Sequence, residues 1–204
     1  MSLELILLRH GTVQGRSGVF RGSSNPPLGP EGWAQMNAIA GAPETQGINV
    51  VFTSPLRRCR EPASMLAERL NAELHVLDDL REIDFGRWEE LSPAEVAERW
   101  PEDLAALYED PVRTTPEGGE PFANFRRRVV SAFEQRVLAT SAERVLVVTH
   151  GGVIRVILSH TLKLDMTQAL RIALPPASRC TLSIEADRTC MMRALTPPPS
   201  RSPS

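Results

Sequence analysis

The stretch Leu5-Ile6-Leu7-Leu8-Arg9-His10-Gly11 decides the fold that this sequence predicts. Its four apolar residues follow one another without a polar break, which is the pattern of a strand buried on both faces of a parallel sheet. Ligands of such sheets bind outside the carboxyl ends of the strands. Because Arg9 and His10 stand at this end, we expect a functional site there.

A second stretch repeats the same design. Residues 144–149 form another buried apolar run, and His150, Gly151 and Gly152 follow it directly. Two strands of one sheet would therefore each deliver a histidine and a glycine turn to the same edge. Our hypothesis is a phosphate-handling site with His10 as the nucleophile.

Composition restricts the classes of partner. The chain has 204 residues, a length that suits one α/β domain, and its net charge of −2 provides no global basic field for nucleic acid or an anionic membrane. Any anion site must therefore come from local arginines. No segment reaches transmembrane length or resembles a signal peptide, and the three cysteines lack metal-ligand spacing. These features predict a cytoplasmic protein with reduced thiols.

Alternating apolar runs and amphipathic segments predict an α/β fold with a mostly parallel sheet. We expect one domain over residues 1–195 and a flexible Pro/Ser-rich tail over 196–204. Strands are expected at 3–8, 48–52, 74–77, 144–149, 179–185 and 189–195. Helices are expected at 29–40, 55–70, 121–138, 153–162 and 167–173, with one more opening at the capping box Ser92–Glu95. The loop over 12–29 is long for a compact domain, so we expect it to wrap the site.

The helix after residue 54 carries an unusual charge pattern. Ser54 suits the N-cap and Pro55 the first helical position. Arg57, Arg58 and Arg60 then lie in the first two turns, where the helix dipole favours an anion over a cation. This cluster predicts a bound anion. A solvated basic face explains Arg57 and Arg60 equally well, so Arg58 is the candidate.

Four motifs in this order resemble the signature of the histidine phosphatase superfamily, over roughly residues 3 to 187. They are Arg9-His10-Gly11, Thr53–Arg58, Leu80–Glu89 and Thr149–Arg155. The resemblance implies a three-layer α/β/α sandwich of the phosphoglycerate mutase-like type. It also implies a phosphoric monoester hydrolase of the histidine acid phosphatase type that uses neither metal nor cofactor.

The resemblance assigns a role to five residues. His10 is the nucleophile, since a neutral imidazole nitrogen can attack phosphorus and form a phosphohistidine. Arg9 and Arg58 bind phosphate oxygens with planar, charged forks, and His150 adds a further donor. Glu82 protonates the leaving alkoxide and then takes a proton from water. Asp84 is the alternative acid.

This sequence departs from the family pattern at several places. Thr12 replaces the usual acidic or polar residue after the first motif, and the 15–17 region lacks a common asparagine. Pro62 stands where the second motif usually has threonine, and Glu90 where glycine often follows. None of these departures touches the five assigned residues.

The reaction and the substrate are less closely defined than the site. The two histidines could be metal ligands, although the neighbouring arginines would repel a cation. Gly152 stands where the family's mutases carry asparagine, which favours a phosphatase that acts on a small phosphorylated metabolite. The loop at 18–28 is similar to that of α-ribazole phosphatases, while a sugar phosphate is an equally good substrate. Two other functions stay open: a phosphoglycerate mutase-type reaction, and the binding of phosphorylated ligands by a catalytically weak protein. A homodimer also stays open.

Overall fold

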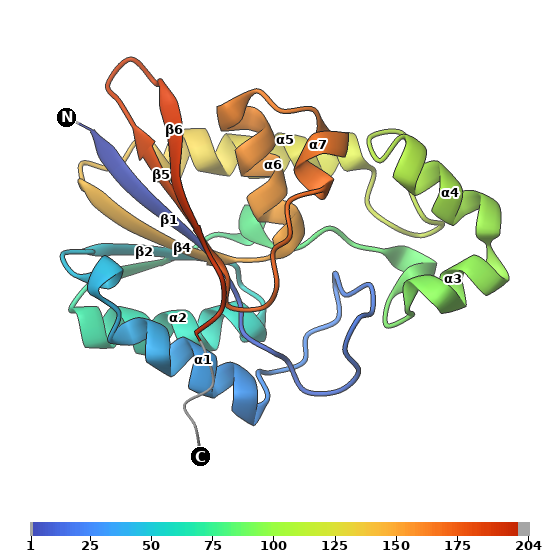
Figure 1. Ribbon diagram of the computed structural model, residues 1–204, viewed down its shortest axis with the longest axis horizontal. Coiled ribbons are helices and arrows are strands. Elements are labelled where there is room, and N and C mark those ends of the chain that lie inside the picture. The colour runs from blue at the N-terminus through green and yellow to red at the C-terminus, as the bar shows by residue number, and fades with distance from the viewer. Residues whose placement is uncertain (1, 200–204) are drawn as a thin grey trace.

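Six strands form one sheet in the order β3-β2-β4-β1-β5-β6 (Figure 1). The computed structural model describes residues 2–199. The strands are β1 (Leu3–Arg9), β2 (Val50–Thr53), β3 (Glu73–Val76), β4 (Arg144–Thr149), β5 (Arg179–Ile184) and β6 (Cys190–Thr196). The first four strands in this order pair in parallel, whereas β5 and β6 are antiparallel. The predicted α/β fold with a mostly parallel sheet is therefore confirmed.

Seven α-helices accompany the sheet within residues 2–199. They are α1 (Pro30–Ala40), α2 (Arg57–Leu70), α3 (Pro93–Arg99), α4 (Pro101–Glu109), α5 (Phe122–Ala132), α6 (Gly151–Leu162) and α7 (Met166–Leu170). A π-helical segment, Phe133–Val137, continues α5.

Side chains along β1 alternate between two cores. Leu5 and Leu7 pack into a core built with α5 and α6, while Ile6 and Leu8 face a second core built with α1 and α2. All four are buried. An apolar run without a polar break is thus explained by helices on both faces of the sheet, which makes the three layers seen in Figure 1.

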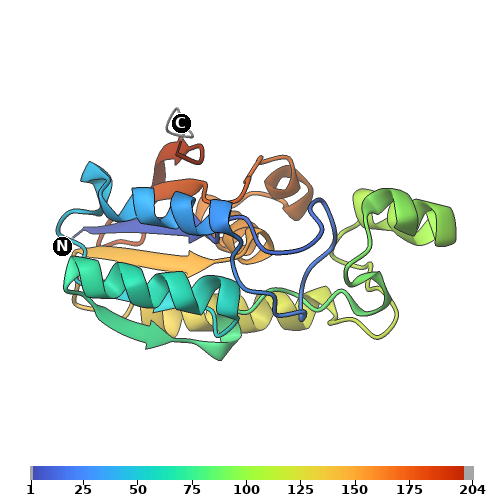
Figure 2. The same ribbon diagram turned by 90° about the horizontal axis from the view of Figure 1, so that it is seen from below.

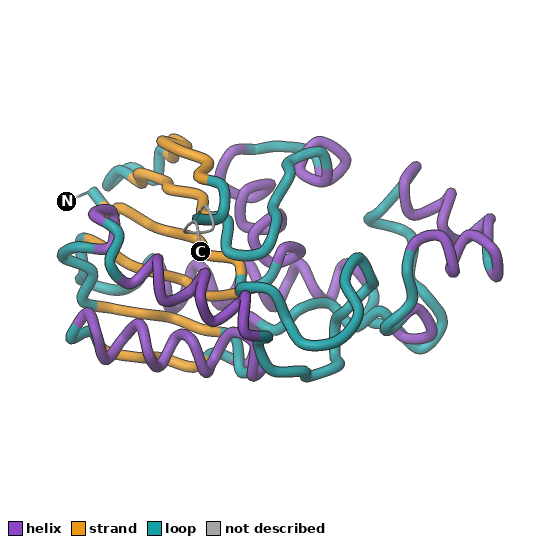
Figure 3. Tube along the Cα trace, turned by 60° about the horizontal axis from the view of Figure 1, so that its bottom comes forward, coloured by secondary structure: helices purple, strands orange, loops and turns teal. Residues whose placement is uncertain are grey.

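Register brings the two histidines to the same level. Arg9 of β1 pairs with Thr149 of β4, so the residues that follow, His10 and His150, leave the sheet side by side. Figure 2 shows both strands ending at the side from which α3 and α4 extend. In Figure 3 the loops gather between this edge and the α3–α4 segment. This segment packs around a small core of its own, which includes Trp88, Val96 and Leu104.

Two local expectations about helix starts have different outcomes. The helix α2 begins at Arg57, its N-cap is Leu56, and the predicted caps Ser54 and Pro55 precede it. The physical reason is that the Ser54 hydroxyl bonds to His150 and to the Leu56 amide instead of capping a helix. The capping box of Ser92 and Glu95, by contrast, is present as predicted.

The predicted tail partly belongs to the sheet. Thr196 closes β6, and residues 197–199 have no regular structure. The rest of the tail, 200–204, lies outside the described residues.

Because β4 is buried on both faces, a Val→Ala substitution should lower the free energy of unfolding more on β4 than on the edge strand β3. Val147→Ala, at a fully buried position, should lower the free energy of unfolding by roughly 1.5–3 kcal/mol, because two methyl groups leave a closed core. Val76→Ala on the edge strand β3, where the side chain is 45% exposed, should cost less than about 0.5 kcal/mol. Urea unfolding of both variants measures the difference. Equal losses would contradict the assignment of β4 to the centre of the sheet.

Candidate active site

The two histidine rings lie together at the carboxyl edge of the sheet. Their centroids are 5.4 Å apart at an interplanar angle of 66°. The His10 amide donates to the Thr149 carbonyl at 2.9 Å, which joins the two strand ends directly. Both side chains are buried. The structure therefore brings together the two histidines that the sequence placed at one edge.

The hydrogen bond at His10 fixes its tautomer. Nδ1 lies 2.8 Å from the Gly11 carbonyl oxygen, and a carbonyl only accepts, so Nδ1 carries the proton. Burial of the ring, together with the positive charges of Arg9 and Arg58, holds the pKa of His10 well below its usual value. The neutral ring then has its lone pair on Nε2, which has no hydrogen-bond partner within residues 2–199. His10 lines a cavity of about 430 Å³. Such a nitrogen is a nucleophile.

His150 has the opposite tautomer. The Arg58 guanidinium donates from Nε to His150 Nδ1 at 3.3 Å, so the imidazole proton is on Nε2 and is donated to the Ser54 hydroxyl at 2.7 Å. Burial and the charge of Arg58 lower the pKa of His150 as well. Both of its ring nitrogens are thus occupied by protein groups. In this arrangement His150 lies behind His10, outside the lining of the cavity.

Arg58 is fully buried and points its donors at a loop. Nη1 donates to the Ser24 carbonyl at 2.5 Å and Nη2 to the Gly22 carbonyl at 2.8 Å. Arg58 is also absent from the cavity lining. Its direct contact with phosphate stays a prediction. What the structure shows is a charge that acts on His10 from behind and a side chain that holds the loop.

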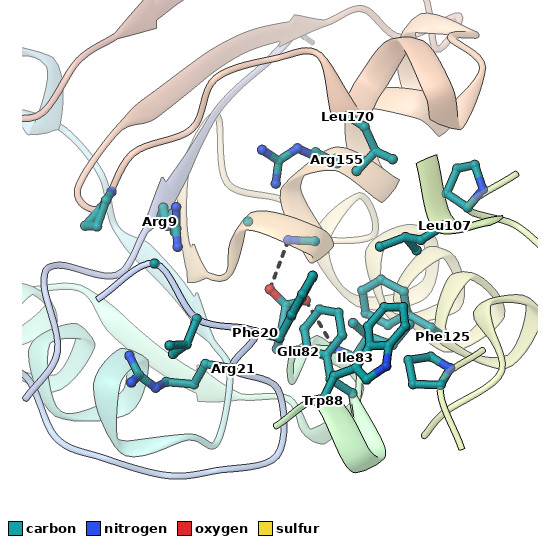
Figure 4. A pocket seen from close by; sticks show the side chains of 18 of the residues that line it. Arg9, Phe20, Arg21, Glu82, Ile83, Trp88, Leu107, Phe125, Arg155 and Leu170 are labelled. Atoms are coloured by element: carbon teal, nitrogen blue, oxygen red, sulfur yellow. Dashed lines mark hydrogen bonds between the residues drawn. The ribbon is translucent and has the colours of Figure 1, made fainter. Parts of the chain in front are cut away.

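Glu82 lines the cavity and is fixed by two backbone amides. Gly152 donates to Oε2 at 3.0 Å and Ile83 to Oε1 at 3.1 Å (Figure 4). Gly152 belongs to the first turn of α6, where a carboxylate is favoured by the helix dipole. A Cβ at position 152 would lie 2.3 Å from Oε1, so only glycine leaves room for Glu82 here.

Arg155 is a site residue that our sequence analysis did not assign. Its Nη2 donates to the Ile172 carbonyl at 3.0 Å, and Arg9 donates to the Leu174 carbonyl. A Cβ on Gly151 would lie 3.0 Å from Arg155 Nη1 and 3.8 Å from Arg9 Cζ, so the two guanidinium groups approach each other across this glycine. Neither forms an ion pair with a described residue. Two unpaired cations at the start of α6 make a site for an anion.

The signal for Arg155 was present in the sequence. It lies one helical turn after Gly151, and therefore on the same face of α6, inside the motif that also contains His150. Three other residues weighed in the sequence analysis lie outside the cavity lining: Asp84, Arg57 and Arg60. Asp84 accepts the Gly86 amide at 2.8 Å within its own loop.

Two neighbouring acids, Glu89 and Glu90, hold the long loop over residues 12–29 in place. The Glu89 carboxylate accepts the amides of Gly22 and Ser23, each at 2.9 Å. Glu90 makes a bidentate pair with Arg21 at 2.7 and 2.8 Å, and the hydrogen bond from Arg21 lowers the pKa of Glu90 to about 2. Glu90 has φ of 63°, a left-handed conformation that favours glycine. The ion pair explains why a glutamate is tolerated where the family often has glycine.

Neither a metal site nor a membrane span is evident in the described part of the chain. Across residues 2–199, no three His, Cys, Asp or Glu side chains gather as metal ligands. None of the helices over the same residues is long and apolar enough to cross a bilayer.

Comparison with known proteins identifies relatives of this architecture. The model of the histidine phosphatase superfamily, branch 1, matches residues 5–195. A Mycobacterium tuberculosis protein described as bifunctional is 42% identical over 128 residues, which are 62% of this chain and 35% of that protein. Phosphoserine phosphatase 1 of Hydrogenobacter thermophilus is 32% identical over 133 residues, or 65% of this chain and 63% of that enzyme. The chain thus spans less than two thirds of the length of either relative.

The relatives include phosphatases and mutases alike. An adenosylcobalamin/alpha-ribazole phosphatase of Salmonella typhimurium is 30% identical, and a 2,3-bisphosphoglycerate-dependent phosphoglycerate mutase of Rhizobium etli is 28% identical. Among solved structures, a mycobacterial glucosyl-3-phosphoglycerate phosphatase in complex with inorganic phosphate superposes with a TM-score of 0.80 at 26% identity. The superposition covers 95% of each chain.

The neutral, buried histidines predict a loss of stability in acid. Unfolding restores the ordinary pKa of each ring, so below that value the unfolded chain binds protons that the folded protein does not. Going from about pH 7.5 to about pH 5.5, each histidine should lower the free energy of unfolding by roughly 1 kcal/mol. Urea unfolding at the two pH values tests this. The His10→Gln variant should lose less unfolding free energy between the two pH values than the wild type does. An equal loss in the two proteins would show that His10 is not held neutral.

Proposed function

Because the chain belongs to branch 1 of the histidine phosphatase superfamily, we propose that it is a metal-independent phosphomonoesterase that works through a phosphohistidine on His10. The observation that carries this proposal is the fixed tautomer of His10. Its Nδ1–H is held by the Gly11 carbonyl, its Nε2 is unprotonated, and the ring lines the cavity. A small phosphorylated metabolite is the proposed substrate, with α-ribazole phosphate and sugar phosphates as the candidates.

The reaction proceeds in two displacements. In the first, His10 Nε2 forms a bond to phosphorus while the ester P–O bond breaks, and Glu82 gives its proton to the leaving alkoxide. In the second, water attacks the phosphohistidine, Glu82 takes a proton from it, and the P–N bond returns its electron pair to His10. Inorganic phosphate and the alcohol are the products. The contact of Glu82 with the start of α6 supports this role, because it holds the carboxylate in the cavity beside the nucleophile.

Cations stabilise the charge of the transferring group. Arg9 and Arg155 face each other across Gly151 and have no carboxylate partner within the described chain, so both can bind phosphate oxygens. The positive end of the α6 dipole favours the same anion. Arg58 and His150 support the site from outside the cavity lining. Burial, Arg9 and then Arg58 lower the pKa of His10, and His150 Nδ1 accepts a hydrogen bond from Arg58 Nε.

Gly152 favours hydrolysis over a mutase reaction. A side chain at this position would occupy the place of the Glu82 carboxylate. Glycine therefore lets the Glu82 carboxylate keep its position beside the Gly152 amide, from which it would serve water as well as the leaving group. A mutase-type transfer is the second candidate, and the observation in its favour is the identity with a phosphoglycerate mutase.

Hydrolysis of p-nitrophenyl phosphate in excess EDTA tests the proposal. The wild-type protein should release p-nitrophenol at an unchanged rate when EDTA is added. His10→Ala should lower kcat by a factor of about 10³ or more, because no second histidine and no cysteine within residues 2–199 lines the cavity. Activity lost to EDTA would assign the histidines to a metal. Activity that survives His10→Ala would refute the covalent route. The absence of hydrolysis in the wild type would favour the mutase or a phospholigand-binding role.

Arg155 offers a test of the anion site with a matched control. Arg155→Gln should lower kcat/KM by about 10- to 100-fold, since a charge-assisted hydrogen bond to phosphate is lost. Arg60→Gln, on the exposed face of α2, should change kcat/KM less than about twofold. Competitive inhibition by inorganic phosphate should weaken in parallel for Arg155→Gln alone. Equal behaviour of the two variants would remove Arg155 from the phosphate site.

A further inference from the structure

The cavity has two chemically different ends. Arg9, Glu82 and Arg155 lie around the start of α6 (Figure 4), and His10, which directly follows Arg9, lines the same inner end of the cavity. The remaining lining is largely apolar and extends from the inner end toward α4 and α7. We infer that the alcohol part of the substrate is a bulky apolar or aromatic group that binds in this outer part, an inference that rests on the proposed function.

Five segments of the chain supply the apolar wall. Figure 4 shows these side chains converging on one side of Glu82. The wall comprises Phe20 of the long loop, Ile83 and Trp88 of the segment after Glu82, Leu107 of α4, Phe125 of α5 and Leu170 of α7. Phe20 packs against Trp88 with ring centroids 5.2 Å apart, so aromatic rings form one part of the wall. A polar alcohol would gain nothing from such a surface, whereas an apolar one is removed from water.

The outer wall offers few partners for a sugar or an amino acid. As far as the structure describes the chain, the lining contains no Asp, Asn, Gln or Lys, and its one carboxylate is Glu82. The two arginines of the loop that reach the cavity are occupied, since Arg16 pairs with Glu95 and Arg21 with Glu90. A polyhydroxylated or zwitterionic alcohol would lose more hydrogen bonds to water than the few hydroxyl groups of the lining could replace.

The rim of the cavity exposes apolar surface that a ligand would cover. Leu170 is 39% exposed and Tyr108 is 65% exposed, and both line the opening. Ligand pockets commonly combine such apolar walls with a few polar groups that orient the ligand. In this cavity the polar groups that would orient the ligand are those that would bind its phosphate. Selection of the alcohol would therefore depend on the apolar end.

Primary alkyl phosphates test this inference, because their leaving groups are alike and only their length differs. We expect kcat/KM to rise about two- to fourfold for each added methylene from ethyl through butyl to hexyl phosphate, as each methylene leaves water. Glycerol 3-phosphate, phosphoserine and 3-phosphoglycerate are polar esters for comparison, and their kcat/KM should fall at least about tenfold below that of hexyl phosphate.

Variants of the wall provide the control. Leu170→Ser and, separately, Leu107→Ser should flatten the rise of kcat/KM with chain length, so that hexyl phosphate loses more than ethyl phosphate does. Val112→Ser is the matched control, since Val112 follows α4, is 47% exposed and does not line the cavity. It should leave the whole series unchanged. Because Leu170 is partly exposed, its substitution tests the wall without removing a core side chain.

The outcomes separate this inference from the function on which it rests. A flat series in the wild type, or faster hydrolysis of the polar esters, would overturn the inference and leave the phosphatase intact. An equal fall for all esters in the Leu170→Ser and Leu107→Ser variants would also overturn it. Failure to hydrolyse any ester, p-nitrophenyl phosphate included, would overturn the proposed function itself and the inference with it.

Discussion

The rest of the site depends on the burial of one guanidinium group. Arg58 has no contact with water, and a buried cation must find acceptors for its donors inside the protein. It finds them in the Ser24 and Gly22 carbonyls and in His150. One side chain thereby ties the start of α2 to the long loop and to the end of β4. The charge of Arg58 also helps to lower the pKa of His10. One side chain therefore contributes both to the position of the loop and to the unprotonated form of His10.

The acidic pair Glu89-Glu90 completes this arrangement from the other side. Glu89 holds the loop through its backbone amides, and Glu90 holds it through Arg21. Arg58 binds backbone carbonyls of residues 21–24, while Glu89 and Glu90 bind backbone amides and the Arg21 side chain of the same residues. A Cβ on Gly22 would lie 1.8 Å from the Ile83 carbonyl oxygen, which shows how closely the two segments approach. A loop without regular structure is in this way held in place by hydrogen bonds to its backbone. That placement is what allows Phe20 to form part of the cavity wall.

The sequence predicted the parts of the molecule that depend on local pattern. The apolar runs located the strands that end at His10 and His150, and the Ser92–Glu95 box located the start of α3, because burial on two faces and capping both leave a signal over a few residues. Contacts between distant residues left no such signal. The Ser54 hydroxyl bonds across the sheet to His150 instead of capping α2, and the acceptors of Arg58 lie more than thirty residues away from it in the chain. Arg155 lies inside a motif of the sequence, but only the structure shows its position opposite Arg9 across Gly151.

The separate small core beneath α3 and α4 has an evolutionary consequence. The proposed nucleophile His10 directly follows β1 of the central sheet, whereas Leu107 is carried by a segment that packs around Trp88, Val96 and Leu104. Substitutions in this segment can remodel the outer wall while the inner end of the cavity stays in place. Part of the surface that would select the alcohol can therefore change by natural selection while the fold that carries the reacting groups is kept. A family that keeps one sheet edge can in this way diversify by exchanging a short helical insertion.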